Sequence, residues 1–282
     1  MTDAEPDGSL PARLRALLTG LGGDGRRRAK AAARGGQGDA DLVLAEGPHL
    51  VEEAVRAGLT VVAVVATEEG RTGAAGEAVA ALAHRGVPVH TVAARAFAGL
   101  AATRAPQGVL AVVRLPSPPP LAGAWAGEGL VLGLDAVQDP GNVGALARTA
   151  RAAGAAMVAL GRGSARPDDA KTLRASQGAL FFVPAWRGDL AEAVAAARAA
   201  GARVAATAPR GGVAPWRADL RGPVLLLLGG EGAGLAPALA EAADLRLTLP
   251  MAAGESLGVA AAGAVVLYER VRQHAGAGGG GA

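Results

Sequence analysis

One stretch near the middle of the chain, residues 130–154, limits the choice of fold more than any other part of the sequence. It begins with an apolar run, residues 130–134, which predicts a buried strand. The run ends in a polar loop, residues 135–142, that contains two aspartates, a proline, a glycine and an asparagine. A helix is expected from about Val143. A strand, a polar loop and a helix in this order are typical of an α/β protein, which carries reactive groups where its parallel strands end.

The alternation of strands and helices continues on both sides and predicts two domains, each of the α/β class. Residues 40–115 contain short apolar strands separated by helices, and residues 130–274 contain a longer series of the same kind. Residues 116–129 are interpreted as a linker because their proline-rich start is stiff and cannot pair in a sheet. The terminal segments, 1–39 and 275–282, are expected to be flexible, and the first of them is basic.

In the second domain the residues also predict individual elements. A wholly apolar run at 223–228 predicts a central strand, because only a strand buried on both faces is apolar throughout. Another strand is expected at 179–183, and the last helix is expected to begin at Ser256. Asp168 or Asp169 is expected to cap a helix that contains Lys171.

Composition excludes several function classes. The 282 residues include no cysteine, which excludes disulfides, thiolate nucleophiles and cysteine-ligated metals. No apolar run is long enough to span a membrane, and the N-terminus lacks the pattern of a signal peptide, so a cytoplasmic protein without membrane contact is expected. The formal net charge is +3, and five of the basic residues are clustered: Arg26, Arg27, Arg28, Lys30 and Arg34. This cluster is either a solvated arm or an arm that becomes ordered on RNA.

The polar residues of the second domain allow two readings each. Gly229 to Gly234 follow the central strand, and they form either a tight turn or a loop that brings backbone close to a ligand. Glu231 favours a functional loop, because a carboxylate at the end of an apolar strand is costly without a partner. Asn142 is either a helix cap or a hydrogen-bonding group that positions another residue. Arg148 is either solvated or a phosphate ligand.

Taken in order, three motifs resemble those of the SpoU/TrmH family of RNA ribose 2′-O-methyltransferases, in the SPOUT superfamily. The first runs from Asp135 through Asn142 to Arg148, and the second is LGGEGAGL at 228–235. The third contains LPM at 249–251 and then Ser256 and Leu257. The N-terminal half, with LAEGPHLVEEAVRAGL at 44–59 and TRAPQGVLAVV at 103–113, is similar to the ribosomal-protein-like RNA-binding domain of many members.

The resemblance implies a fold, a reaction and a set of site residues. Family members transfer a methyl group from S-adenosyl-L-methionine to a ribose 2′-hydroxyl, in a C-terminal domain that forms a trefoil knot. They are usually homodimers, and the accessory domain implies rRNA more than tRNA as the substrate; no metal is implied. Carried over, the catalytic group consists of Asn142, Arg148, Glu231 and Ser256. The cofactor-binding group consists of Gly229, Leu249, Met251 and Leu257.

The third motif departs from the family pattern, which usually reads Ser-Leu-Asn-Val-Ser. Gly258 stands in place of the asparagine and Ala260 in place of the second serine. An active methyltransferase is expected because the four catalytic residues are present. The alternative is a non-catalytic RNA-binding protein of the same fold. A methyltransferase of the unknotted kind ranks last, because its glycine-rich turn would come early in the domain.

Overall fold

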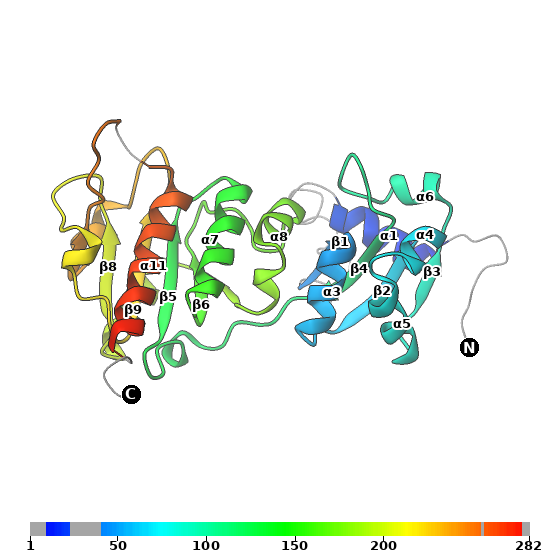
Figure 1. Ribbon diagram of the computed structural model, residues 1–282, viewed down its shortest axis with the longest axis horizontal. Coiled ribbons are helices and arrows are strands. Elements are labelled where there is room, and N and C mark those ends of the chain that lie inside the picture. Colours follow the sequence, from blue (N-terminus) through cyan, green and yellow to red (C-terminus); the bar gives the residue numbers. More distant parts are fainter. Residues whose placement is uncertain (1–9, 23–40, 255–256, 278–282) are drawn as a thin grey trace. The chain divides into compact units, whose positions relative to one another are not determined.

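The computed structural model describes residues 10–22, 41–254 and 257–277, and their contacts divide the chain into two compact units (Figure 1). The first unit contains the described residues up to Pro116 together with Asp168–Phe182, and the second contains Ser117–Pro167 together with the described residues from Val183 onward. The α/β class is confirmed for both units. The domain boundaries expected from the sequence stay a prediction. None of the helices in the described part of the chain is long and apolar enough to cross a membrane.

The first unit contains a four-stranded mixed sheet in the order β1-β4-β2-β3. Strand β4 is antiparallel to both of its neighbours, β1 and β2, while β2 and β3 are parallel. The strand bounds are Leu42–Glu46 for β1, Val61–Ala66 for β2, Val89–Thr91 for β3 and Val109–Arg114 for β4. All five residues of β1 and the first five of β4 are buried, as expected for strands covered on both faces.

Helices cover this sheet and complete its core. The helix bounds are Ala12–Gly22 for α1, Pro48–Arg56 for α3, Glu68–Thr72 for α4, Gly76–His84 for α5, Ala94–Ala98 for α6 and Ala170–Ser176 for α8. Leucines of α1 recur at helical spacing, so that Leu14, Leu18 and Leu21 all lie in one apolar cluster with Phe97. Asp169 caps α8, because its carboxylate accepts hydrogen bonds from the backbone N–H groups of Lys171 and Thr172.

The expected strand at 179–183 is wrong. The chain forms a 3₁₀ turn there, η3 (Ala179–Phe181), closed by a 3.0 Å hydrogen bond from the N–H of Phe181 to the carbonyl of Gly178. Gly178 has a φ of +77°, which turns the chain out of the direction of α8. The three residues of η3 are buried, and a short buried run is equally compatible with a strand and with a turn of helix.

The second unit contains a six-stranded, wholly parallel sheet in the order β10-β8-β9-β5-β6-β7. The strand bounds are Leu130–Asp135 for β5, Met157–Leu160 for β6, Ala185–Arg187 for β7, Arg203–Thr207 for β8, Val224–Gly229 for β9 and Leu245–Leu247 for β10. Strand β9 lies between β8 and β5 and its first five residues are buried, which confirms the central strand expected from its composition. Strands β5 and β9 end side by side, with Asp135 opposite Gly229.

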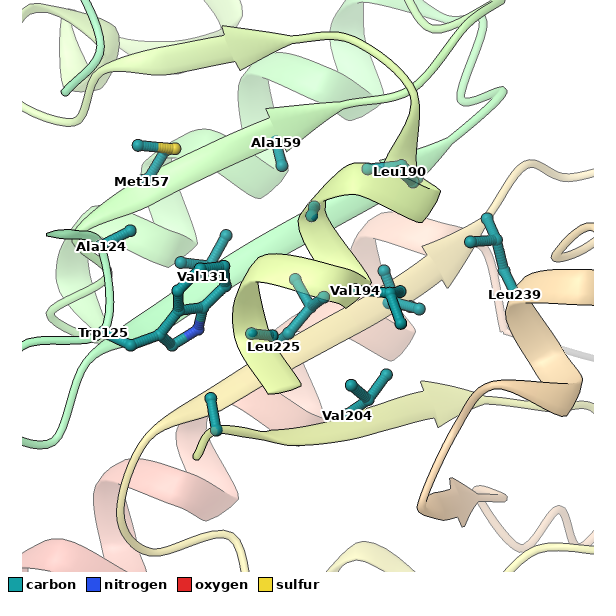
Figure 2. Close-up of a cluster of buried hydrophobic side chains, with 14 of the residues drawn as sticks. Ala124, Trp125, Val131, Met157, Ala159, Leu190, Val194, Val204, Leu225 and Leu239 are labelled. Atoms are coloured by element: carbon teal, nitrogen blue, oxygen red, sulfur yellow. The ribbon is translucent and has the colours of Figure 1, made fainter. Parts of the chain in front are cut away.

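Helices cover both faces of this sheet. On one face, α9 (Leu190–Ala199), η2 (Leu121–Gly123) and α10 (Pro237–Glu241) enclose an apolar cluster that includes Trp125, Val131 and Leu225 (Figure 2). On the other face, α7 (Pro140–Ala152) and α11 (Val259–Ala277) lie side by side (Figure 1).

The side chains of β9 show how its two faces are divided. Leu225 and Leu227 lie in the α9 cluster, whereas Leu228 lies beside Gly263 of α11. This alternation is the period-2 pattern of a strand that is buried on both sides. A last 3₁₀ turn, η4 (Pro215–Arg217), contacts α11.

Candidate active site

The first site residues lie where β5 passes into α7. The helix begins at Pro140, three residues before the expected start, and its N-cap is Asp139. The Asp139 carboxylate accepts a 3.0 Å hydrogen bond from the backbone N–H of Asn142. Proline suits the first position of a helix because the N–H it lacks has no partner there. The reading of Asn142 as the helix cap is therefore wrong, since Asn142 lies inside the first turn.

The side chain of Asn142 is consequently available for another contact. Its Nδ2 donates a hydrogen bond to Oε1 of Glu231, which lies in the loop after β9. Two residues predicted from separate motifs thus meet at the carboxyl edge of the sheet. Glu231 is exposed and Asn142 is half-buried, so the pair remains accessible to a substrate.

The glycine loop is a tight turn that is fastened to the end of β5. Asp135 accepts two hydrogen bonds from this loop. Its backbone carbonyl accepts one of 2.8 Å from the N–H of Gly230, and its side-chain Oδ2 accepts one of 2.8 Å from the N–H of Ala236. A Cβ atom added to Gly230 would lie 2.3 Å from the carbonyl oxygen of Ala136, and one added to Gly229 would lie 2.0 Å from the backbone of Gly234. Glycine is required at both positions, because any side chain would force the backbone apart.

The loop after β6 is fastened to the same segment from the other side. The buried hydroxyl of Ser164 donates to the carbonyl of Leu134 at 2.9 Å and accepts from the N–H of Val137 at 3.1 Å. The N–H of Ala165 also donates to the carbonyl of Val137 at 2.9 Å. Sequence reasoning missed Ser164, because a lone serine in an irregular loop carries no periodic or motif signal. The site loops after β5, β6 and β9 therefore form one hydrogen-bonded group.

Arg148 lies on the third turn of α7 and is exposed. It forms no ion pair or hydrogen bond with any residue in the described ranges. A guanidinium is always protonated in a protein, so Arg148 can bind an anion but is not itself a base. Its chemistry suits a phosphate or an oxygen that gains negative charge.

The predicted cofactor residues follow β9 and β10. Gly229 ends β9, Leu249 is half-buried, and the side chains of Met251 and Leu257 are 39% and 41% exposed. Thr248, next to Leu249, connects the end of β10 with the loop after β8. Its hydroxyl donates a hydrogen bond to the carbonyl of Ala208 at 3.0 Å and accepts one from the N–H of Gly212 at 2.9 Å.

These residues fit S-adenosylmethionine chemically. Exposed apolar side chains can cover an adenine ring and a methionine chain, while a glycine turn leaves backbone groups open to form hydrogen bonds with their polar atoms. Within the described part of the chain no group of three or more acidic or histidine side chains could hold a metal ion.

Several predicted residues lie outside the described ranges. They are Ser256 of the catalytic group and the basic cluster of Arg26, Arg27, Arg28, Lys30 and Arg34. The last helix is described from Val259, three residues later than the expected start at Ser256. Gly258 directly precedes it, and a Cβ atom added there would have nothing within 4 Å.

Comparison with known proteins agrees with this geometry. Residues 129–268 match the SpoU rRNA Methylase family, and residues 44–119 match the domain described as "RNA 2'-O ribose methyltransferase substrate binding". The 23S rRNA (guanosine(2553)-2'-O)-methyltransferase RlmP of Bacillus subtilis is 38% identical over 226 residues, which are 80% of this chain and 86% of the relative.

Solved structures are similar over nearly the whole chain. The SpoU methyltransferase AviRb from Streptomyces viridochromogenes, in complex with AdoMet, is 29% identical with a TM-score of 0.78, covering 94% of this chain and 99% of AviRb. The AdoMet-bound rRNA methyltransferase from Sinorhizobium meliloti is 29% identical with a TM-score of 0.79, covering 94% and 96% of the two chains.

A parallel sheet with a glycine turn and an Asn–Glu pair at its carboxyl edge, and with an unpaired arginine on the adjoining helix, is preceded here by a substrate-binding domain. This combination defines a class of RNA-modifying enzymes. The chain belongs to the SpoU rRNA methylase family. It is an RNA ribose 2′-O-methyltransferase, and its methyl donor is S-adenosylmethionine.

Proposed function

We propose that this enzyme methylates a ribose 2′-hydroxyl of 23S rRNA. The relatives carry the proposal: the RlmP of Bacillus subtilis and the RlmB of Xanthomonas campestris, 38% and 36% identical, are both named as 23S rRNA 2′-O-methyltransferases. The contact of Asn142 with Glu231 favours an active enzyme, since both polar side chains are held where the reaction would occur. Because the proposed substrate is rRNA, the proposed compartment is the cytoplasm, where ribosomes are made.

The proposed mechanism assigns each catalytic residue a task. When bound, S-adenosylmethionine supplies an electrophilic methyl group on a sulfonium. Arg148 binds the phosphate next to the target ribose, and its positive charge lowers the pKa of the 2′-hydroxyl. The carboxylate of Glu231 fixes the amide of Asn142, which leaves the Asn142 carbonyl oxygen free to accept a hydrogen bond from that hydroxyl. Ser256 is proposed to donate a hydrogen bond in the same group.

Gly229, Leu249, Met251 and Leu257 are proposed to hold the cofactor. The glycine turn supplies backbone contacts, and the exposed side chains of Met251 and Leu257 would be covered by the bound adenosyl group. No metal takes part in this scheme. The basic cluster from Arg26 to Arg34 is proposed to bind RNA phosphates, as an arm that precedes the RNA-binding domain.

We further propose that the enzyme is a homodimer and that its methyltransferase domain is a trefoil knot. Val265 and Tyr268 lie one turn apart on α11 and are 41% and 56% exposed, and Trp216 in the neighbouring η4 is 53% exposed. Large apolar side chains that gather on one surface favour a protein interface. Sedimentation of the full chain tests the dimer, and pulling a single chain from both ends tests the knot, because a knotted chain stops short of its full contour length.

The experiment that tests the function uses unmodified 23S rRNA transcribed in vitro and S-adenosylmethionine with a tritiated methyl group. Methyl incorporation is expected with the wild type, and mapping of ribose methylation then identifies the nucleotide. Arg148→Ala is expected to lose incorporation while it retains cofactor binding. Arg221→Ala removes the same charge at the amino edge of the sheet and is the matched control. Cofactor binding without methyl transfer to any rRNA or tRNA would contradict the proposal.

A further inference from the structure

Three exposed arginines lie on neighbouring elements of one half of the parallel sheet. Arg148 is on α7, Arg162 follows β6 by two residues, and Arg187 is the last residue of β7. None of the three forms an ion pair or a hydrogen bond with a residue that the structure describes. Strands β5, β6 and β7 are consecutive neighbours. Arg162 and Arg187 therefore lie at the carboxyl edge, and Arg148 lies on the third turn of the helix that follows β5.

Arg162 is held close to the β5 loop by its own loop. The N–H of Gly161 continues the sheet ladder to the carbonyl of Leu134 at 2.9 Å, and Ser164 makes two hydrogen bonds to the same segment. Between them, the position of a Cβ on Gly163 lies 3.5 Å from the Cβ of Ala136. The backbone on both sides of Arg162 is therefore fixed, which lowers the entropy lost when its side chain binds a ligand.

Arg187 lies on the same face of the sheet as α7. It pairs with Leu160 in the β6–β7 register. The preceding residue, Trp186, packs against the α9 cluster, so alternation along the strand directs Arg187 to the opposite face. Asp189, the next carboxylate along the chain, does not pair with Arg187. Its carboxylate instead caps α9 by accepting a 3.0 Å hydrogen bond from the N–H of Ala191.

Arg148 is on the flank of α7 that faces this half of the sheet. Leu146, two residues earlier, would touch a Cβ on Gly263 of α11, and two residues correspond to about 200° around a helix. Arg148 consequently points away from α11, which lies over β9 and β5 (Figure 1). The acidic groups Asp135 and Glu231 are on the β9 side, where they hold the glycine turn and Asn142.

We propose that Arg162 and Arg187, together with Arg148, form a basic edge that binds consecutive backbone phosphates of the RNA beside the target ribose. The inference rests on the proposed function and extends it to two residues outside the three motifs. A guanidinium presents a planar fork of donors that matches a phosphate, and three unpaired forks on fixed backbone suit a run of phosphates better than a single anion. The edge would thus position the strand so that its ribose reaches Arg148 and Asn142.

Binding of unmodified 23S rRNA to the full chain, measured over a series of salt concentrations, tests the proposal. Arg162→Ala and Arg187→Ala are each expected to weaken binding about fivefold, because an exposed ion pair contributes up to about 1 kcal/mol. Each is also expected to make the slope of log affinity against log salt shallower by about 0.7 to 0.9. Cofactor affinity is expected to stay unchanged, because neither residue is in the cofactor group.

Arg221→Ala is the control, since it removes an exposed arginine at the opposite edge and leaves the net charge equal to that of the test variants. Equal RNA affinity and equal salt slopes for Arg162→Ala, Arg187→Ala and Arg221→Ala would overturn the proposal. The binding measurement does not depend on methyl transfer, so failure of the basic edge and failure of the proposed activity are distinguishable. In a methylation assay, the two test variants are expected to raise KM for RNA and leave kcat within about twofold.

Discussion

Asn142 and Glu231 are 89 residues apart in the sequence, yet their side chains are hydrogen-bonded at the carboxyl edge of the second unit's sheet. The contact exists because β5 and β9 are neighbours that end together, with Asp135 opposite Gly229. It links the first turn of α7, the helix that also carries Arg148, with the glycine turn. Together with the two hydrogen bonds that Asp135 accepts from the glycine loop, this polar pair fixes the proposed substrate side of the site relative to the proposed cofactor side.

This coupling predicts that the two side chains act as a unit. Glu231→Ala is expected to lower methyl transfer about 10-fold to 100-fold, because a hydrogen bond to a charged group contributes about 1.5 to 3 kcal/mol. Asn142→Ala is expected to have a similar effect, and the double variant should cost little more than either single variant. Rates for the four proteins give the coupling energy. Additive effects would mean that the two residues act separately.

The glycine turn gives a second prediction with a matched control. Gly230→Ala places a Cβ 2.3 Å from the carbonyl oxygen of Ala136, so the turn must move away from β5. We expect a loss of about 1 to 3 kcal/mol in the free energy of unfolding and weaker binding of S-adenosylmethionine. Gly232→Ala, at a position with nothing within 4 Å, should change neither. Thermal unfolding measures the stability of both variants, and titration with S-adenosylmethionine measures their cofactor affinity. Equal stability and equal affinity of the two variants would contradict the prediction.

Much of the fold follows from the pattern of apolar residues, and the reason is physical. Strands β5 and β9 are buried on both faces, so their composition alone distinguishes them from the surrounding helices. The pattern fails at 179–183, where burial without periodicity suits both a strand and a helical turn, and the positive φ of Gly178 decides between them.

Only part of the candidate site could be predicted from the sequence, because motifs identify residues but not their contacts. Asn142, Arg148 and Glu231 belong to motifs, but no motif says that Asp139 is the cap and that Asn142 is thereby left to contact Glu231. Ser164 lies outside every motif, and its role depends on burial between two loops that only the folded chain brings together.

Gly258 allows a direct test of the departure from the family pattern. An added Cβ has nothing within 4 Å, and the residue directly precedes α11, so Gly258→Asn is expected to fold normally. Asparagine is also a good helix cap, and the variant should be more stable by a few tenths of a kcal/mol. We expect kcat to rise or remain equal, as measured by tritiated methyl transfer. A large loss of activity would mean that the glycine is itself required.

Because of His90, the stability of the first unit is expected to depend on pH. Partial burial in β3 lowers the pKa of its imidazole below 6.5, the usual value, because desolvation disfavours the charged form. The unfolded chain then binds more protons than the folded chain as the pH falls below 6.5, so stability decreases over that range until the folded pKa is passed. His90→Gln should weaken this dependence. Urea unfolding of the wild type and the variant between pH 7.5 and about 5 measures the difference, and identical pH profiles would contradict it.

Gly263 provides the last prediction, on the contact between α11 and α7. A Cβ at this position would lie 2.4 Å from Cδ2 of Leu146 and 3.1 Å from Cδ1 of Leu228, and both leucines are buried, so neither has room to move away. Gly263→Val is expected to cost about 1 to 3 kcal/mol in the free energy of unfolding, despite its better helix propensity, because overpacking separates the two helices. Leu146→Ala alone should also destabilise the protein by leaving a cavity.

Combining the two substitutions distinguishes this cause from a general effect of valine in a helix. In the double variant the valine side chain occupies space that Leu146 has vacated. The double variant should therefore lose less free energy of unfolding than the sum of the two single losses, by about 0.5 kcal/mol or more. Denaturant unfolding of the four proteins gives this coupling energy. Methyl transfer should recover in parallel, because α7 carries Asn142 and Arg148 and its position against α11 sets where both side chains lie. Additive effects would place the strain somewhere other than the α7–α11 contact.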